Sequence, residues 1–290
     1  MVGKQQSVGF IGLGLMGRPM AEHIMQVGYV LYIWGRDKNK YSDLIRQGAV
    51  WCDNPYSLAS KVDVCILCLT SGEVVKEVLF GIEGFFSTGN QNKIIIEHST
   101  LLPSDAVSIA NKVKSFKSHY IDVPVTGSVV GANNASLVAF MGGDKAIIKQ
   151  VESLLGCYCC KMTYMGRSGA GLNTKMCNQI ILANTLLSAF EMVSFANNAH
   201  LSIEKVLEAL QGGFVDSKAW RLFCQSAKDP DADDVAFIKN IVKDLRYIVA
   251  SANHNGTRPL SSTHNLDLIE PLMDMGLGDE DLKVINRLFS

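Results

Sequence analysis

Short apolar runs alternate with amphipathic segments through the first half of the chain. Each run is nearly continuous in apolar residues, which is typical of strands buried on both faces of a parallel sheet. The segments between them carry apolar residues at helical spacing, which predicts helices that cover the sheet. The predicted strands are 8–11, 29–34, 62–69, 93–97, 119–123 and 137–141, and the predicted helices are 18–27, 38–47, 57–60, 72–79, 103–115 and 145–155.

The strand pattern ends near residue 166, and helical periodicity continues to the end of the chain. A glycine-rich segment leads into one long predicted helix through the stretch that ends at His200. Shorter helices are predicted at 203–211, 218–226, 238–253 and 265–275. The pattern therefore predicts an α/β fold: a doubly wound parallel sheet over residues 1–166, then a long interdomain helix and an all-α domain over residues 167–290.

A tight glycine turn lies between the first predicted strand and the first predicted helix, at Gly12, Gly14 and Gly17. Gly12 permits the sharp turn, Gly14 lets the backbone approach a pyrophosphate, and Gly17 lets the helix pack closely on the strand. The start of the helix then directs free N–H groups toward the phosphates. The motif in this setting predicts a Rossmann-type, dinucleotide-binding first domain.

The end of the second predicted strand indicates which dinucleotide binds. An acidic residue there holds the ribose hydroxyls of NAD, whereas a neutral residue followed by arginine leaves room for the 2′-phosphate of NADP. This chain has Gly35 at the acidic position and Arg36 after it, with Lys38 close behind. The sequence favours NADP. Asp37 leaves NAD open if the turn is shifted, and it is also a suitable cap for the helix that follows.

Charge and hydropathy narrow the class of partner. The formal net charge of −1 argues against nucleic acid or an anionic membrane as the main partner. The most apolar segment, 180–196, is interrupted by polar residues, so we expect no transmembrane helix. The first residues lead directly into a strand, so we expect no signal peptide and a cytoplasmic protein.

The cysteines indicate neither a disulfide framework nor a metal site. Cys65 and Cys68 are three apart on a predicted strand, so they face opposite sides of the sheet. Cys157, Cys159 and Cys160 form a cluster, but no second Cys or His pair stands nearby at ligand spacing. We therefore expect reduced thiols in a reducing cytoplasm and no bound metal.

Three further segments fall where open α/β sheets bind ligands, at strand ends and helix starts. They are 99–103 (STLLP), 122–128 (DVPVTGS) and 169–178 (GAGLNTKMCN). Lys175 and Asn178 are three apart on the long predicted helix and share a face. A partly buried ammonium beside an apolar cleft is a suitable proton donor to an alkoxide, although most helical lysines are simply solvated.

These motifs, in this order, resemble the β-hydroxyacid dehydrogenase family, which includes 3-hydroxyisobutyrate dehydrogenase, tartronate semialdehyde reductase and glyoxylate/succinic semialdehyde reductases. The resemblance runs nearly end to end. GFIGLGLMGRPMA resembles the cofactor signature, STLLP the nicotinamide-side loop, DVPVTGS the substrate loop and GAGLNTKMCNQ the start of the catalytic helix. Segments 243–245 and 276–279 resemble further family landmarks.

The resemblance implies an NADP-dependent oxidoreductase that interconverts a small 3-hydroxy acid, or a related hydroxy acid, and its semialdehyde or keto form by hydride transfer. Lys175 would be the general acid/base and Asn178 its partner. The implied substrate is a small carboxylate-bearing aldehyde or hydroxy acid, held by Thr126, Gly127, Ser128 and Lys243. The implied assembly is a homodimer or homotetramer built through the helical domain. The implied cofactor-binding residues are Gly12, Leu13, Gly14, Leu15, Met16, Gly17, Arg36, Leu69, Thr70, Thr100 and Lys243.

The chain departs from the family pattern in its substrate loop. Thr126 stands where the family usually has serine, and Ser128 stands where it usually has glycine. In the next turn, Ala135 stands where the family often has glycine. The added bulk at Thr126 and Ser128 narrows or reshapes the carboxylate pocket. The related 6-phosphogluconate dehydrogenases carry an acidic residue two turns after the lysine, where this chain has Leu182, which argues against a decarboxylating step.

Two alternative functions fit the same scaffold. One is a regulatory protein that binds NAD(P) without catalysis, although mere binding gives no reason for a lysine at position 175. The other is an imine reductase. Imine reductases resemble this family but generally replace the lysine, so Lys175 favours carbonyl chemistry.

Overall fold

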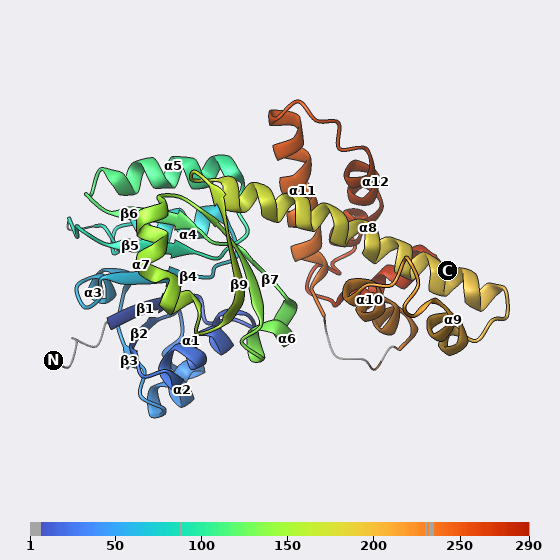
Figure 1. Ribbon diagram of the computed structural model, residues 1–290, viewed down its shortest axis with the longest axis horizontal. Coiled ribbons are helices and arrows are strands. Elements are labelled where there is room, and N and C mark those ends of the chain that lie inside the picture. Colours follow the sequence, from blue (N-terminus) through green and yellow to red (C-terminus); the bar gives the residue numbers. More distant parts are fainter. Residues whose placement is uncertain (1–6, 88, 230, 232–234, 290) are drawn as a thin grey trace. The chain divides into compact units, whose positions relative to one another are not determined.

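The computed structural model describes residues 7–289 except 88, 230 and 232–234. By its internal contacts the chain divides into two compact units, one up to Lys175 and one from Met176 onward. Helix α8 (Ala170–Asn198) crosses this division (Figure 1). The predicted domain boundary after residue 166 falls at the end of strand β9 (Cys159–Gly166), just before α8.

The first unit is built on one sheet, which has nine strands within the described residues. The strands run in the order β3-β2-β1-β4-β5-β6-β8-β7, and β9 pairs with β8. The six strands from β3 to β6 are parallel, which confirms the predicted doubly wound sheet. Strand β8 is antiparallel to β6 and β7 and parallel to β9. The other strands are β1 (Ser7–Ile11), β2 (Val30–Trp34), β3 (Val50–Trp51), β4 (Val64–Leu67), β5 (Ile94–Glu97), β6 (His119–Asp122), β7 (Val125–Thr126) and β8 (Leu137–Gly142).

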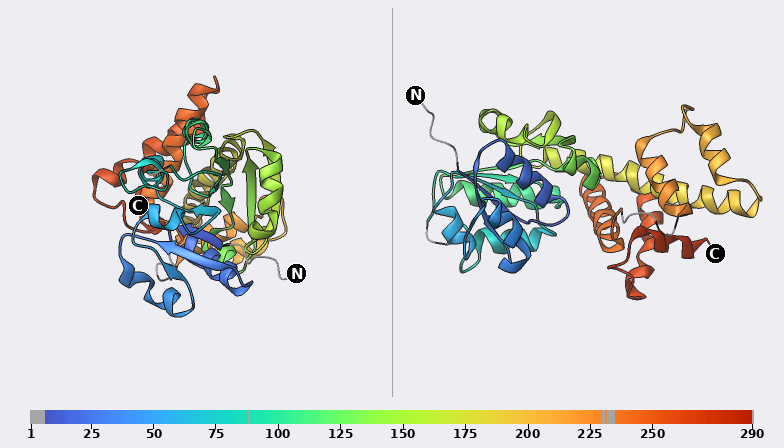
Figure 2. Two further views of the ribbon diagram at one scale, coloured as in Figure 1. Left: turned by 90° about the vertical axis from the view of Figure 1, so that its left-hand side faces the viewer. Right: turned by 90° about the horizontal axis from the view of Figure 1, so that it is seen from below.

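Helices cover both faces of this sheet (Figure 2). On each face, a separate apolar core lies between the sheet and its helices. Alternate residues of a buried strand enter opposite cores, as Cys65 and Ile66 of β4 do. Cys68 packs against the core opposite to that of Cys65, as their spacing predicts. One core takes side chains from α1 (Gly17–Gln26), α2 (Ser42–Arg46) and α7 (Lys145–Leu155), and the other from α3 (Pro55–Ala59), α4 (Gly72–Phe80) and α5 (Pro103–Lys114).

Some short elements differ from the prediction. The helix predicted over 38–47 is a 3-10 turn, η1 (Lys38–Tyr41), followed by α2. Strands β3 and β7 and helix α6 (Ser128–Asn133) were not predicted. These elements are only two to six residues long, too short for a hydrophobic period to register.

The second unit is helical in its described residues, apart from one isolated bridge between Phe237 and Asp281. Its core gathers large side chains such as Phe190 of α8 and Trp220 of α10. The helix predicted over 265–275 is divided, because Pro271 has no N–H to donate and begins a new helix. The helices after α8 are α9 (Ile203–Leu210), α10 (Lys218–Lys228), α11 (Ile238–His254), α12 (Leu260–Ile269), α13 (Pro271–Asp274) and η2 (Leu282–Leu288).

Helix α8 is long and apolar enough, by length and composition only, to cross a membrane. The sequence prediction of no such segment relied on the absence of a long uninterrupted apolar run. The mean hydropathy of this helix is nevertheless high enough for a membrane span, despite its polar residues. In its most apolar window, 39% is buried within the structure. A single helix of this kind is weak evidence for a membrane span, because core helices of soluble proteins pass the same test.

Candidate active site

The glycine turn after β1 combines close packing with one open position. Gly12 has φ +101°, and a Cβ there would overlap the carbonyl oxygen of Cys68. A Cβ at Gly17 would overlap the carbonyl oxygen of Gly12. A Cβ at Gly14, in contrast, would have no atom within 4 Å. Gly12 and Gly17 are therefore required by packing, whereas Gly14 faces open space, the side from which the sequence predicts that a pyrophosphate approaches.

The start of helix α1 is suited to an anion. The residue before it, Met16, makes no side-chain capping hydrogen bond, and the first turn carries no acidic residue. Arg18 turns its guanidinium to Glu22 and Asp43 instead. Leu13 is buried in the core, and the Leu15 side chain is 64% exposed. The first-turn N–H groups of α1 thus carry the partial positive charge that binds phosphate.

The end of β2 is where the sequence predicts the adenosine contacts. A Cβ at Gly35 would overlap the ring of Tyr41, so an acidic side chain does not fit there unless that ring moves. The Asp37 carboxylate accepts a hydrogen bond from the Asn39 backbone N–H at 3.0 Å, as the cap of η1. This confirms Asp37 as a helix cap, the structural role considered for it. Arg36 is exposed beside Gly35.

Two further predicted cofactor loops are tied together at the ends of β4 and β5. The Leu69 N–H donates to the Ser99 hydroxyl oxygen at 2.6 Å, and the Ser99 N–H donates to Glu97 at 2.8 Å. Thr70, which follows Leu69, is exposed, and Thr100, which follows Ser99, is half-buried. The hydrogen bonds fix the two loops to each other beside the glycine turn, because β4 lies between β1 and β5.

Glu97 and His98, which sequence reasoning did not single out, are buried beneath these loops. Burial raises the pKa of Glu97 to about 8, and its second carboxylate oxygen has no hydrogen-bond partner among the described residues. Burial lowers the pKa of His98 to about 4. The His98 ring lies 2.6 Å from the Val123 carbonyl oxygen and 2.8 Å from the Tyr158 hydroxyl. The only feature of the sequence that could have indicated Glu97 and His98 is their position at the end of a predicted strand.

Lys175 lies beside the predicted substrate loop. Its Nζ donates a 2.9 Å hydrogen bond to the carbonyl oxygen of Val125, the residue that precedes Thr126. Thr126 is half-buried, and Gly127 and Ser128 are exposed. The first unit therefore brings together Lys175 and the three predicted substrate-binding residues Thr126, Gly127 and Ser128.

Two non-glycine residues, one at the end of the substrate loop and one just after helix α6, have backbone conformations that favour glycine. Ser128 has φ +59° and Ala135 has φ +49°, both in the left-handed region. These are the two positions at which the resembled family has glycine. The backbone at both positions has a conformation that glycine adopts easily, and a residue with a side chain is destabilised in it.

A buried carboxylate connects the substrate loop to the start of α8. Asp122 accepts hydrogen bonds from the Gly169 N–H at 2.8 Å and the Leu172 N–H at 3.0 Å. Burial raises its pKa to about 6, and these backbone hydrogen bonds limit the rise. The sequence prediction placed Asp122 in the loop motif but gave it no role.

The other predicted site residues lie in the second unit. The Asn178 amide donates to Gln179 at 2.8 Å, and the Gln179 amide donates to Asp244 at 2.5 Å. Lys243 lies 3.5 Å from the other oxygen of Asp244. Asn178 and Lys243 are thus joined through two residues that the sequence prediction did not single out as site residues.

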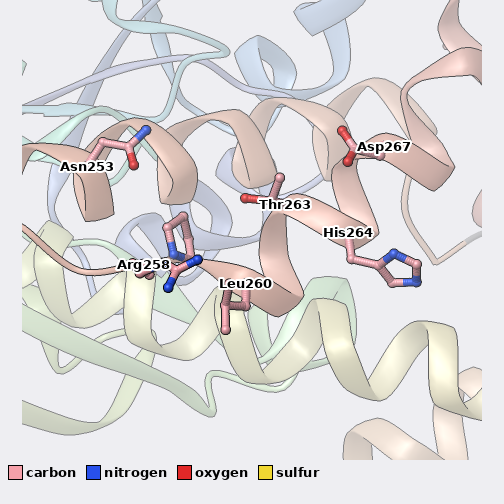
Figure 3. A pocket seen from close by; sticks show the side chains of 7 residues that line it. Asn253, Arg258, Leu260, Thr263, His264 and Asp267 are labelled. Atoms are coloured by element: carbon pink, nitrogen blue, oxygen red, sulfur yellow. The ribbon is translucent and has the colours of Figure 1, made fainter.

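A pocket of about 420 Å³ lies elsewhere in the second unit, between the end of α11 and α12 (Figure 3). None of the predicted site residues lines it. Its lining consists of Asn253, Arg258, Pro259, Leu260, Thr263, His264 and Asp267. None of the eight cysteines forms a disulfide within the described residues, and this part of the chain contains no group of three His, Cys, Asp or Glu side chains that could hold a metal.

Comparison with known proteins places this geometry in a family. Residues 7–166 match the family model described as the NAD binding domain of 6-phosphogluconate dehydrogenase. Residues 169–289 match the model described as NAD-binding of NADP-dependent 3-hydroxyisobutyrate dehydrogenase. The two models together account for nearly all of the described chain.

Curated relatives agree. The chain is 36% identical to the probable 3-hydroxyisobutyrate dehydrogenase-like 1, mitochondrial, of Arabidopsis thaliana, over 82% of this chain and 71% of that protein. It is 31% identical to the 2-hydroxy-3-oxopropionate reductase of Escherichia coli (strain K12), over 73% of this chain and 72% of that protein.

Solved structures share the fold. A 3-hydroxyisobutyrate dehydrogenase from Salmonella typhimurium superposes with a TM-score of 0.87 at 20% identity, over 98% of this chain and 99% of that one. An imine reductase from Streptomyces aurantiacus superposes with a TM-score of 0.68 at 22% identity, over 98% of this chain and 100% of that one. The family models, the curated relatives and the site motifs agree: the chain belongs to the β-hydroxyacid dehydrogenase family of NAD(P)-dependent oxidoreductases.

Proposed function

We propose that this protein is an NADP-dependent dehydrogenase that interconverts a small 3-hydroxy acid, or a related hydroxy acid, and its semialdehyde or keto form, with Lys175 as general acid/base. The observation that carries the proposal is the position of Lys175 Nζ, 2.9 Å from the Val125 carbonyl oxygen at the start of the substrate loop. A proton donor held there lies within reach of an oxygen on a substrate bound by that loop.

A nicotinamide cofactor, when bound by the predicted cofactor residues, would supply the hydride for reduction and accept it in oxidation. In reduction, the Lys175 ammonium stabilises the developing alkoxide and gives it a proton, which leaves a neutral amine. In oxidation, the neutral amine takes the hydroxyl proton while the carbon loses its hydride. The hydroxyl and backbone donors of Thr126, Gly127 and Ser128 hold the substrate carboxylate, which orients the reacting carbon.

NADP rather than NAD is supported by the end of β2. Tyr41 fills the space that an acidic side chain at Gly35 would need, and the Asp37 carboxylate is engaged as the cap of η1. Arg36 is exposed there, and a guanidinium fork suits a phosphate monoester. A solved protein named Psf3, 23% identical with a TM-score of 0.89, was crystallised with NADP+.

The test is a kinetic matrix of NADPH and NADH against a panel of small semialdehydes, with a cyclic imine included. The panel contains glyoxylate and the semialdehydes of succinate, tartronate and methylmalonate. We expect turnover of at least one carboxylate-bearing aldehyde, with NADPH preferred over NADH. Preference for NADH would contradict the role of Arg36, and turnover of the imine alone would favour the imine reductase alternative.

A homo-oligomer and a cytoplasmic location remain predictions. The helical unit exposes large apolar side chains on α8, among them Ile181 (68% exposed) and Phe195 (71% exposed). Exposed apolar surface of this kind is typical of subunit interfaces, which supports an oligomer built through the helices. Light scattering of the purified protein, which reports its mass against the 31.6 kDa chain, tests this.

A further inference from the structure

The start of helix α8 is capped by a residue from a distant strand. The Asp122 carboxylate ends β6, and its two oxygens accept the Gly169 and Leu172 N–H groups at 2.8 and 3.0 Å. The first N–H groups of a helix have no partner within the helix, and a local side chain usually takes them. Here a buried carboxylate from the sheet fulfils that function, and its charge also suits the positive end of the helix dipole.

Two glycines pack so closely around this carboxylate that no larger residue fits at either position. A Cβ at Gly142 would lie 2.6 Å from one Asp122 oxygen. A Cβ at Gly171 would lie 2.5 Å from the Phe140 carbonyl oxygen and 2.6 Å from that of Asp122. The first turn of α8 is therefore packed directly against the backbone of β6 and β8, and Asp122 closes the contact.

The segment from Asp122 to Val125 contacts α8 at two points. Leu172 and Lys175 are three residues apart and share a face of the helix. Leu172 donates to Asp122, and Lys175 donates to Val125, three residues after Asp122. The segment from Asp122 to Val125 therefore holds α8 at its first turn and receives its lysine one turn later.

We propose that Asp122 is a positioning residue, which fixes the first turn of α8 so that Lys175 is presented at the substrate loop. The inference rests on the proposed function, in which Lys175 is the general acid/base. It differs from an ordinary capping role in its consequence: loss of the Asp122 contacts lowers the rate of the chemical step more than it lowers stability or binding, because a displacement of about 1 Å can cost roughly 100-fold in rate.

Asp144 offers a matched control. It caps helix α7 in the same unit, accepting the Ala146 N–H at 2.8 Å, and α7 carries no predicted site residue. Asp122→Asn and Asp144→Asn make the same chemical change. Each amide keeps one acceptor oxygen and presents an NH₂ group where the second oxygen was.

The experiment compares the two variants with NADPH and the best substrate of the panel. For Asp122→Asn we expect a kcat lowered about 10- to 100-fold, with KM and the NADPH Kd within about threefold of wild type. We also expect faster amide hydrogen exchange confined to residues 169–175. For Asp144→Asn we expect wild-type kcat and unchanged exchange at residues 169–175, because the amide oxygen can still accept the Ala146 N–H. Circular dichroism at the assay temperature confirms that both variants are folded.

A folded Asp122→Asn variant with wild-type kcat, or with unchanged exchange at 169–175, would overturn the inference. Equal losses of kcat in both variants would also overturn it, since they would reflect general destabilisation. Failure of the proposed function has a different signature, because Lys175→Ala would then retain turnover. Loss of turnover in Lys175→Ala, together with normal turnover in Asp122→Asn, rejects the positioning role alone.

Discussion

Lys175 Nζ donates a 2.9 Å hydrogen bond to the backbone carbonyl of Val125, which joins the start of α8 to the loop that follows β6. The contact is made to the backbone, so it depends on the path of the chain and not on the identity of side chain 125. It holds the ammonium at the residue that directly precedes the predicted substrate-binding residues Thr126, Gly127 and Ser128. The proposed chemistry requires such an arrangement, in which a proton donor is close to the residues proposed to hold the substrate.

Alanine at two glycines of the cofactor turn, Gly14 and Gly17, should have different effects. Gly14→Ala places a methyl group in open space, so we expect an almost unchanged free energy of unfolding. The same methyl group obstructs the pyrophosphate, so the Kd for NADPH should rise at least about tenfold. Gly17→Ala overlaps the Gly12 carbonyl and should destabilise the protein by about 1–3 kcal/mol.

Urea unfolding without cofactor, combined with a fluorescence titration of NADPH, separates the two glycine effects. Unchanged NADPH binding by Gly14→Ala would show that the phosphates lie elsewhere.

Arg36→Ala should impair the use of NADPH selectively. A hydrogen bond to a charged group is worth about 1.5–3 kcal/mol, so KM for NADPH should rise roughly 10- to 100-fold. KM for NADH, which has no 2′-phosphate, should change less than about threefold. Arg46→Ala, which removes an exposed positive charge from α2, is the control and should leave both values unchanged. Equal effects of Arg36→Ala on both cofactors would reject the 2′-phosphate contact.

Glycine at position 128, at the end of the substrate loop, or at position 135, just after α6, should stabilise the fold. Ser128 and Ala135 both have positive φ, which costs a side-chain-bearing residue about 1–2 kcal/mol. Part of that gain is offset by the entropy of glycine in the unfolded chain, so we expect about 0.5–1 kcal/mol from Ser128→Gly or Ala135→Gly in urea unfolding. Only Ser128→Gly should also change KM for the hydroxy acid. A matching change of KM in Ala135→Gly would argue against a direct substrate role for Ser128.

The buried Glu97 should make stability fall as the pH rises. Its pKa in the folded protein is about 8 against an ordinary 4.5, so between these values the folded state keeps a proton that the unfolded state releases. Asp122, raised from 3.8 to about 6, acts in the same direction. His98, lowered from 6.5 to about 4, acts in the opposite direction, since only the unfolded state takes its proton as the pH drops below 6.5.

Glu97→Gln isolates the Glu97 contribution. Relative to wild type, the variant should gain more stability at pH 8 than at pH 5, as measured by urea unfolding at both values. An equal difference at the two pH values would contradict the assignment.

The sequence predicted the sheet and most of its helices because these elements carry their signal locally. Continuous apolar runs marked the parallel strands, and the glycine turn marked the first strand–helix junction. Lys175 could be selected as a candidate because it stands in a glycine-rich helix start with apolar neighbours; its catalytic role stays a prediction. These features depend on residues close together in the chain, within reach of hydrophobic periodicity.

What could not be predicted depends on distant partners. Asp122 meets the Gly169 N–H across 47 residues, and Gln179 meets Asp244 across 65, so no local pattern marks either contact. Glu97 at a strand end resembles any polar residue that closes an apolar run. The positive φ of Ser128 was also hidden, because serine is not a residue that predicts the left-handed conformation.

The central claim is that Lys175 performs the proton transfer at the substrate loop. Lys175→Ala, assayed with NADPH and the best substrate of the panel, tests it most directly. General acid/base groups contribute about 10²- to 10⁴-fold, so kcat should fall by at least 100-fold while the Kd for NADPH and the unfolding midpoint stay near wild type. A folded Lys175→Ala enzyme that binds NADPH and turns over at near the wild-type rate would contradict the account.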